Sequence, residues 1–210
     1  MKNFILAVLM VVLSVQSCFA AEIHQEIFNG NENLQYPVVK IGDSAVESKI
    51  NGAIIAEIDR FLTAVYKNAQ VNDFEVAGVW TKYKIGSNEA GNTVILSILL
   101  TESVYNKGAA HPSTYLRALN FNLANGELMG INYLLEVGEG LREGYLLERL
   151  NQKLVEKVER EKLFLFPEAL PLKKLPQDFY WDENLHVHFI FQQYEIAPYA
   201  VGIIDVDIDA

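Results

Sequence analysis

The spacing of apolar residues predicts two amphipathic helices. Between residues 43 and 68, apolar side chains recur three and four positions apart, as on one face of a helix; they are Val46, Ile50, Ile54, Ile58, Phe61 and Val65. Ser44, followed three residues later by Glu47, predicts a capping box at the start of this helix. A second stripe within residues 141–162 predicts another helix, whose charged side faces water; the stripe consists of Leu147, Leu150, Leu154 and Val158.

Elsewhere apolar and polar residues alternate, which predicts strands. The alternating segments are 34–41, 79–85, 93–105, 115–123, 185–191 and 204–208. Residues 87–92 are expected to join the second and third segments into a hairpin, and Asn125-Gly126 to form a tight turn after the fourth. Within 93–105 the apolar residues alternate with Ser97, Thr101 and Ser103, so we expect one buried face and one face largely in water.

The order of these elements predicts an α+β fold. A helix, a meander of strands, a second helix and more strands are typical of a largely antiparallel β-sheet with two main amphipathic helices packed on one face. The sequence shows no internal repeat, low-complexity tract or proline-rich linker, so residues 21–210 are expected to form a single domain.

Residues 1–20, MKNFILAVLMVVLSVQSCFA, have the pattern of a signal peptide. Cleavage after Ala20 would give an exported protein, periplasmic or extracellular, with no transmembrane segment and no cysteine in the mature chain. The alternative is a lipoprotein signal, in which Cys18 follows Val15, Gln16 and Ser17 and carries a lipid anchor.

The formal net charge of −10 restricts the partners of such a protein. Nucleic acid and anionic lipid are disfavoured, whereas basic proteins, cations or a positively charged wall polymer would be attracted.

Motifs for catalysis are weak. There is no GxSxG elbow, and the sole cysteine lies in the signal segment, so we expect neither an enzyme nor a cofactor. The alternative is a metal-assisted cell-envelope hydrolase, since His186 and His188 share one face of an expected strand and both could bind one ion. That site would need a further ligand; the nearby acids Asp205, Asp207 and Asp209 are more simply interpreted as a solvated strand edge.

Two aromatic segments are the best candidates for ligand contact. YNKGAAHP places His111 in a small-residue turn, where it either hydrogen-bonds across the turn or contacts a ligand. YEIAPYAVG supplies tyrosines with apolar rings and polar tips, which suit both packing and interfaces. The predicted ligand-binding residues are Tyr105, His111, Tyr115, Tyr194, Glu195 and Tyr199.

These segments, with Tyr36-Pro37 and the Asn125-Gly126 turn, resemble the RsiV-type extracellular domain, domain of unknown function 3298. The chain is also similar to the non-catalytic domain that precedes the deacetylase module of some wall-modifying enzymes. The resemblance implies a sheet-and-helix domain outside the cell that binds a partner, which in the best-understood relatives is an attacking lysozyme. Those relatives are membrane-anchored anti-sigma factors, and this sequence lacks their cytoplasmic and transmembrane segments.

The sequence thus predicts an exported, non-catalytic binding domain that recognises lysozyme, another basic protein or a cell-wall glycan. The metal-assisted hydrolase and a structural envelope protein are the alternatives.

Overall fold

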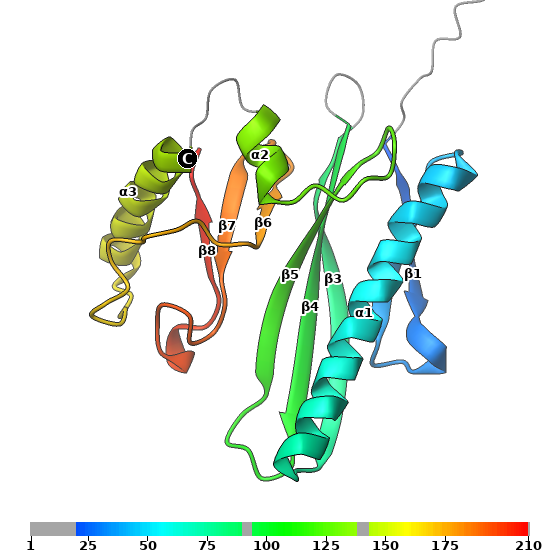
Figure 1. Cartoon of the computed structure of the whole chain (residues 1–210), viewed down its shortest axis with the longest axis horizontal. Coiled ribbons are helices and arrows are strands. Elements are labelled where there is room, and N and C mark those ends of the chain that lie inside the picture. Colours follow the sequence, from blue (N-terminus) through cyan, green and yellow to red (C-terminus); the bar gives the residue numbers. More distant parts are fainter. Residues whose placement is uncertain (1–19, 90–93, 138–142, 210) are drawn as a thin grey trace, which may run out of the picture.

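The computed structural model describes residues 20–89, 94–137 and 143–209 and confirms the α+β class (Figure 1). The predicted signal peptide and Cys18, the middle of the turn at 87–92 and the expected helix start at 141–142 lie outside the described residues. None of the described helices is long and apolar enough to cross a membrane. The elements are β1 (Glu22–Ile27), β2 (Gln35–Lys40), α1 (Ser44–Asn72), β3 (Val76–Asn88), β4 (Ile95–Asn106), β5 (Ser113–Asn122), α2 (Ile131–Val137), α3 (Glu143–Glu161), β6 (Phe179–Trp181), β7 (Val187–Phe191) and β8 (Ile204–Asp207), with short 3-10 turns at Phe28–Gly30 and Tyr199–Val201.

The described strands form three antiparallel sheets rather than one. Their orders are β1-β2, β3-β4-β5 and β6-β7-β8. Figure 1 shows α1 lying across the β3-β4-β5 sheet and α3 beside the β6-β7-β8 sheet, so each main helix has its own sheet. The molecule therefore consists of two halves, each with a helix packed on an antiparallel sheet.

The predicted apolar stripe of α1 forms much of the core of the first half. All six predicted residues are buried, together with the inward-facing residues of β4. The helix begins one residue earlier than the predicted capping box requires. Asp43, not Ser44, is the N-cap, and its carboxylate accepts hydrogen bonds from the backbone N–H groups of Ala45 and Val46. Glu47 instead accepts from the N–H groups of Ile41 and Gly42 and so fixes the chain that enters α1.

The second half has its own core between α3 and the β6-β7-β8 sheet. Leu146, Leu150 and Leu154 are the buried residues of α3, whereas the predicted Leu147 and Val158 are only partly buried beside them. The centre of the predicted stripe, Leu150 and Leu154, is thus confirmed, and in the first turns of the helix Leu146 is buried in place of Leu147.

The prediction that one face of the hairpin lies in water is wrong. Leu99 is 4% exposed and Ser97 is fully buried, because Tyr180 and Ile190 of the second half pack against this face. The polar groups there are paired: Ser97 Oγ donates to Asn120 Oδ1 (2.7 Å) and accepts from the Trp181 N–H (3.1 Å). The face that was expected to be solvated is therefore the junction between the halves.

A row of side chains covers the outer edge of β5. Gln193 Oε1 accepts from the Thr114 N–H (3.0 Å), Gln192 Oε1 from the Leu116 N–H (3.0 Å) and Asp178 Oδ1 from the Ala118 N–H (3.3 Å). Gln192 Nε2 also donates to the Leu116 carbonyl (2.8 Å). The edge of the central sheet is thus hydrogen-bonded by side chains instead of by another strand.

Candidate functional site

The fold brings His111 against the YEIAPY segment, 83 residues further along the chain. The His111 ring stacks on Tyr199, with ring centroids 3.4 Å apart and planes inclined by 14°. Tyr194 lies beside both, and its hydroxyl is 3.3 Å from His111 Nε2. His111 Nδ1 is 3.1 Å from the Pro112 carbonyl, which can accept a hydrogen bond from it. We refer to His111, Tyr194 and Tyr199 as the aromatic cluster.

Local turns hold the aromatic cluster in place. Tyr194 adopts a left-handed backbone conformation with φ of 65°, which is unfavourable for a side chain of this size. Glu195 supports that turn, because its Oε2 accepts from the Gln192 N–H at 2.7 Å. On the other side, the hydroxyl of Tyr105 donates to the Ala109 carbonyl at 3.1 Å and stabilises the turn that carries His111.

Three of the six predicted ligand-binding residues do not join the cluster. Tyr105 and Glu195 make the turn contacts, and Tyr115 lies on the face of the sheet that α1 covers, where its ring is 6.0 Å from the guanidinium carbon of Arg117. Ligand contact by the six residues remains a prediction.

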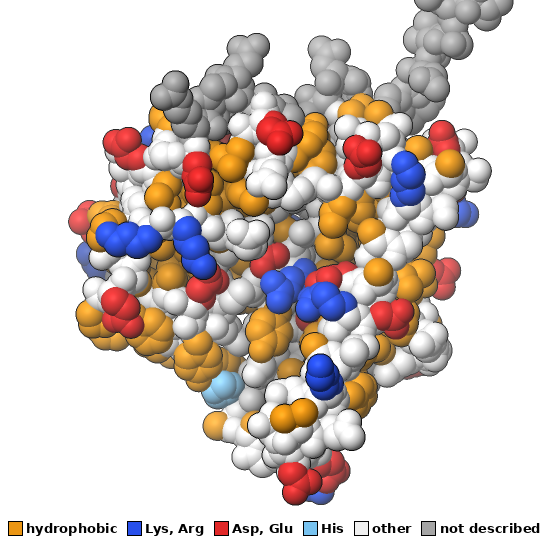
Figure 2. Space-filling view, viewed as in Figure 1, with side chains coloured by type: hydrophobic (Ala, Val, Ile, Leu, Met, Phe, Trp, Pro, Cys, Tyr) orange, Lys and Arg blue, Asp and Glu red, His pale blue; other side chains and the backbone are white. Residues whose placement is uncertain are grey.

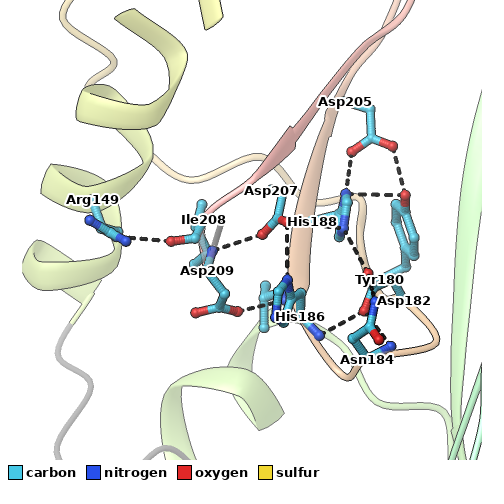
Figure 3. Close-up of polar contacts among 11 residues, drawn as sticks. Arg149, Tyr180, Asp182, Asn184, His186, His188, Asp205, Asp207, Ile208 and Asp209 are labelled. Atoms are coloured by element: carbon cyan, nitrogen blue, oxygen red, sulfur yellow. Dashed lines mark hydrogen bonds and ion pairs between the residues drawn. The ribbon is translucent and has the colours of Figure 1, made fainter. Parts of the chain in front are cut away.

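A second group of polar side chains lies on β7 and β8 (Figure 3). His188 lies on β7 and His186 directly precedes this strand, and both have aspartates of β8 beside them. His188 Nδ1 is 2.7 Å from Asp205 Oδ1, and His186 Nδ1 is 3.1 Å from Asp207 Oδ2. The aspartates do lie on an edge strand, as interpreted, but Asp205 and Asp207 are not merely solvated, since each also contacts a histidine that the sequence pattern could not place beside it.

Burial and charge act in opposite directions on His188. Burial disfavours its charged form, but the hydrogen bond that His188 donates to Asp205 and the charges of Asp205, Asp207 and Asp182 outweigh burial and raise the pKa of His188. The hydrogen bond to Asp207 raises the pKa of His186 as well. Burial and the hydrogen bond that Tyr180 donates to Asp205 (2.6 Å) raise the pKa of Tyr180. The arrangement therefore favours protonated histidines held between carboxylates.

The same arrangement is poorly suited to a metal ion. Each histidine is held by its own aspartate, and a hollow beside His188 is lined by basic side chains of α3: Lys153, Lys157 and Arg160. Among the residues that the structure describes, no three His, Cys, Asp or Glu side chains are grouped so as to hold a metal ion.

Replacing Asp205 by asparagine is expected to lower the pKa of His188, because the substitution removes the closest carboxylate while keeping its shape. An NMR titration of the imidazole resonances measures this directly. Asp209→Asn is the matched control, since Asp209 accepts from the Val187 N–H rather than from His188. An unchanged His188 titration in Asp205→Asn would show that the carboxylate does not support the charge.

A pocket of about 320 Å³ between α1 and the β4–β5 face contains a buried acid that the sequence analysis missed. Glu102 is 1% exposed, and its burial and the nearby charge of Glu57 raise its pKa to about 8, although Arg60 and Arg117 act in the opposite direction. Figure 2 shows basic and acidic side chains together in a hollow between α1 and the half that contains α3. The sequence does contain an indication of this buried acid. Glu102 interrupts a series of apolar residues on the buried side of its strand, namely Leu96, Ile98, Leu100 and Val104.

The fold and these sites define an α+β protein of two helix-on-sheet halves, with an exposed aromatic cluster and a charged pocket. Residues 137–210 match the family described as "Protein of unknown function (DUF3298)". This match spans α3, β6, β7 and β8. It therefore includes His186 and His188 with their aspartates, and the YEIAPY segment. No curated protein sequence matches the chain.

Solved structures of DUF3298 proteins have a similar fold. A family protein from Pseudomonas aeruginosa PAO1 is 16% identical, with a TM-score of 0.61 over 90% of this chain and 87% of that chain. A member from Bacteroides fragilis NCTC 9343 is also 16% identical, with a TM-score of 0.52 over 89% and 87% of the two chains. The similarity therefore extends over nearly the whole chain and concerns the fold, while the narrower RsiV-type and deacetylase resemblances remain predictions.

Proposed function

We propose that this protein is a non-catalytic binding domain that acts outside the cytoplasm and recognises a basic protein, such as lysozyme, through the aromatic cluster. The observation that carries the proposal is the stacking of His111 on Tyr199 beside an exposed Tyr194.

The cluster has the physical properties of a recognition surface. Tyr194 is 57% exposed, and the turn that presents it is held in a strained conformation by hydrogen bonds. Rings fixed in this way lose little conformational entropy when they are covered, and tyrosines are frequent at the energetic centres of interfaces. The formal net charge of −10 adds a long-range attraction for a basic partner.

The metal-assisted hydrolase is the weaker candidate. His186 and His188 already hydrogen-bond to aspartates, and their raised pKa values favour the protonated form, which cannot ligate a metal.

Calorimetric titration of the protein with lysozyme, at low and at moderate salt, tests the proposal. We expect binding that weakens with salt, and at least a tenfold loss of affinity in Tyr194→Ala, the usual effect of removing a central interface tyrosine. Tyr66→Ala is the matched control, since Tyr66 is similarly exposed but lies on α1.

Absence of lysozyme binding, or equal losses in the Tyr194 and Tyr66 variants, would overturn the proposal. Binding of a soluble cell-wall glycan in place of lysozyme, lost in Tyr194→Ala, would keep the aromatic cluster as the site but reject a basic protein as its ligand.

A further inference from the structure

The pocket beneath α1 is separate from the aromatic cluster. It has features of a ligand site that folding of the chain alone does not explain. Glu102 lies at its base, and apolar side chains of α1 and β4, among them Phe61, Val65 and Val104, form its walls. A carboxylate in such surroundings is strongly disfavoured unless a positive group compensates it.

Three buried polar atoms around this pocket have no hydrogen-bond partner within the described part of the chain. They are Glu102 Oε1, Asn106 Oδ1 and Arg117 Nε. Arg117 Nε still has an ionic partner in Glu57 Oε1, 3.8 Å away. Native proteins pair nearly all buried polar atoms, so the two oxygen atoms without a partner at one pocket indicate that something outside the chain satisfies them. Two of the three are acceptors, which calls for a ligand that donates hydrogen bonds.

The charged groups of the pocket and of the adjoining hollow together leave one negative charge uncompensated when Glu102 is ionised. Arg60 of α1 and Arg117 of β5 line the pocket beside Glu102. The same two arginines line the adjoining hollow with Glu57 of α1 and Asp178, which precedes β6. Arg60 pairs with Glu57, and Arg117 Nη1 lies 3.0 Å from Asp178 Oδ2. The closest positive atom to Glu102 is Arg60 Nη2, 3.5 Å from Oε2, whereas Oε1 is buried and has no hydrogen-bond partner among the described residues. On the neighbouring strands, the residues opposite Glu102 are Thr81 on β3 and Tyr115 on β5, so neither strand places a cationic side chain directly opposite it.

We propose that this pocket binds a primary alkylammonium group, such as a lysine side chain, with Glu102 as its counter-ion. The ammonium donates to Glu102 Oε1, and the carbon stem lies along the apolar walls.

Asn106 lines the same pocket further along β4. Glu102 and Asn106 are four residues apart on one strand, about 13 Å along it. A lysine side chain with its ammonium at Glu102 therefore brings its own backbone near Asn106, whose Oδ1 accepts a peptide N–H.

Other cations fit less well. A guanidinium prefers two parallel hydrogen bonds to a carboxylate, but Oε2 of Glu102 already faces Arg60. A metal ion would require further acidic or imidazole ligands, and the described residues offer no such group here.

Binding is coupled to the loss of a proton from Glu102, since the ammonium takes over the role of that proton. With a carboxyl pKa of about 8 in the free protein, affinity rises about 50-fold from pH 6 to pH 8 and then levels off until the ammonium itself deprotonates near pH 10.

The test uses Nα-acetyl-lysine-N-methylamide as the probe, with the norleucine analogue, which lacks the ammonium, as its control. Calorimetry and NMR between pH 6 and pH 9 should show a Kd of about 1 mM at pH 8, as expected for a ligand of this size. The norleucine analogue should not bind. Absence of lysine-probe binding, or affinity independent of pH, overturns the proposal.

A substitution on the exposed side of α1 and its matched control assign the binding to this pocket without disturbing the core. Ala64 lies exposed on α1 at the pocket, so Ala64→Leu should obstruct it and weaken binding at least tenfold. Ala56→Leu adds the same side chain elsewhere on the exposed part of α1 and should leave binding unchanged. Glu102→Gln should remove the pH dependence together with most of the affinity; retained, pH-dependent binding in that variant would contradict the assignment.

Comparing the affinities of the lysine probe and of n-pentylamine distinguishes a peptide ligand from a free amine. Tighter binding of the lysine probe than of n-pentylamine indicates a peptide ligand that also contacts Asn106, whereas equal affinities indicate a free amine. The inference is independent of lysozyme binding: loss of probe binding in Ala64→Leu with intact lysozyme binding separates the pocket from the aromatic cluster.

Discussion

Replacement of Gly86 by alanine is expected to lower the free energy of unfolding by about 2–3 kcal/mol, within the range for overpacking a close contact. An added Cβ at Gly86 would lie 2.6 Å from the Trp181 carbonyl oxygen and 2.8 Å from Tyr180 Cδ2. Because the first of these atoms is backbone, the strand β6 has to move away from β3. Urea unfolding followed by tryptophan fluorescence measures the loss, since Trp181 lies at the contact.

Gly52→Ala is the control for a glycine without such a contact. It lies on the exposed side of α1, and no atom lies within 4 Å of an added Cβ. Alanine there should raise stability by up to about 1 kcal/mol through helix propensity. If Gly86→Ala were also neutral or stabilising, the halves would not be packed as closely as the structure shows.

Replacement of Glu102 by glutamine is expected to remove a large part of the pH dependence of stability. The carboxyl pKa is about 8 in the folded protein against the ordinary 4.5, so the folded protein keeps a proton that the unfolded chain has lost between these values. Wild-type stability therefore falls as pH rises from 4.5 to 8 and is flat above. Glutamine does not titrate, so the variant should gain about 2–4 kcal/mol over the wild type between pH 5 and pH 9.

Chemical unfolding at several pH values checks this prediction. His188 also loses stabilising charge as pH rises through its raised pKa, so the difference between variant and wild type is the informative quantity. Glu75→Gln serves as the control, because the exposed ion pair of Glu75 with Lys107 should contribute less than about 1 kcal/mol to the free energy of unfolding. Parallel pH profiles for wild type and Glu102→Gln would show that the carboxyl group is not perturbed.

The elements with strong periodicity could be predicted from the sequence. The stripe of α1 and the alternation in β4 are long enough to fix both type and position. The strand β1 was missed, because its sequence, EIHQEI, is mostly polar and the strand is held by pairing with β2. The three-residue β6 is too short for any periodic signal, and α2 precedes the segment in which a helix was expected.

The sites illustrate where local patterns stop being informative. The sequence singled out His111, Tyr194 and Tyr199 separately, but their contact depends on how the second half docks on the first. Likewise, alternation placed His188 and Asp205 on strand faces, while only the pairing of β7 with β8 places them 2.7 Å apart. Such contacts between residues far apart in the chain cannot be derived from the spacing of residues in the sequence.

The covered edge of β5 limits how another protein can be recognised. Gln192, Gln193 and Asp178 occupy consecutive outward N–H groups of that strand, where an incoming peptide would otherwise form a ladder. β-Augmentation at this edge would first have to displace all three side chains. The same covering protects the sheet from edge-to-edge aggregation, an advantage for a strand that begins beside the aromatic cluster.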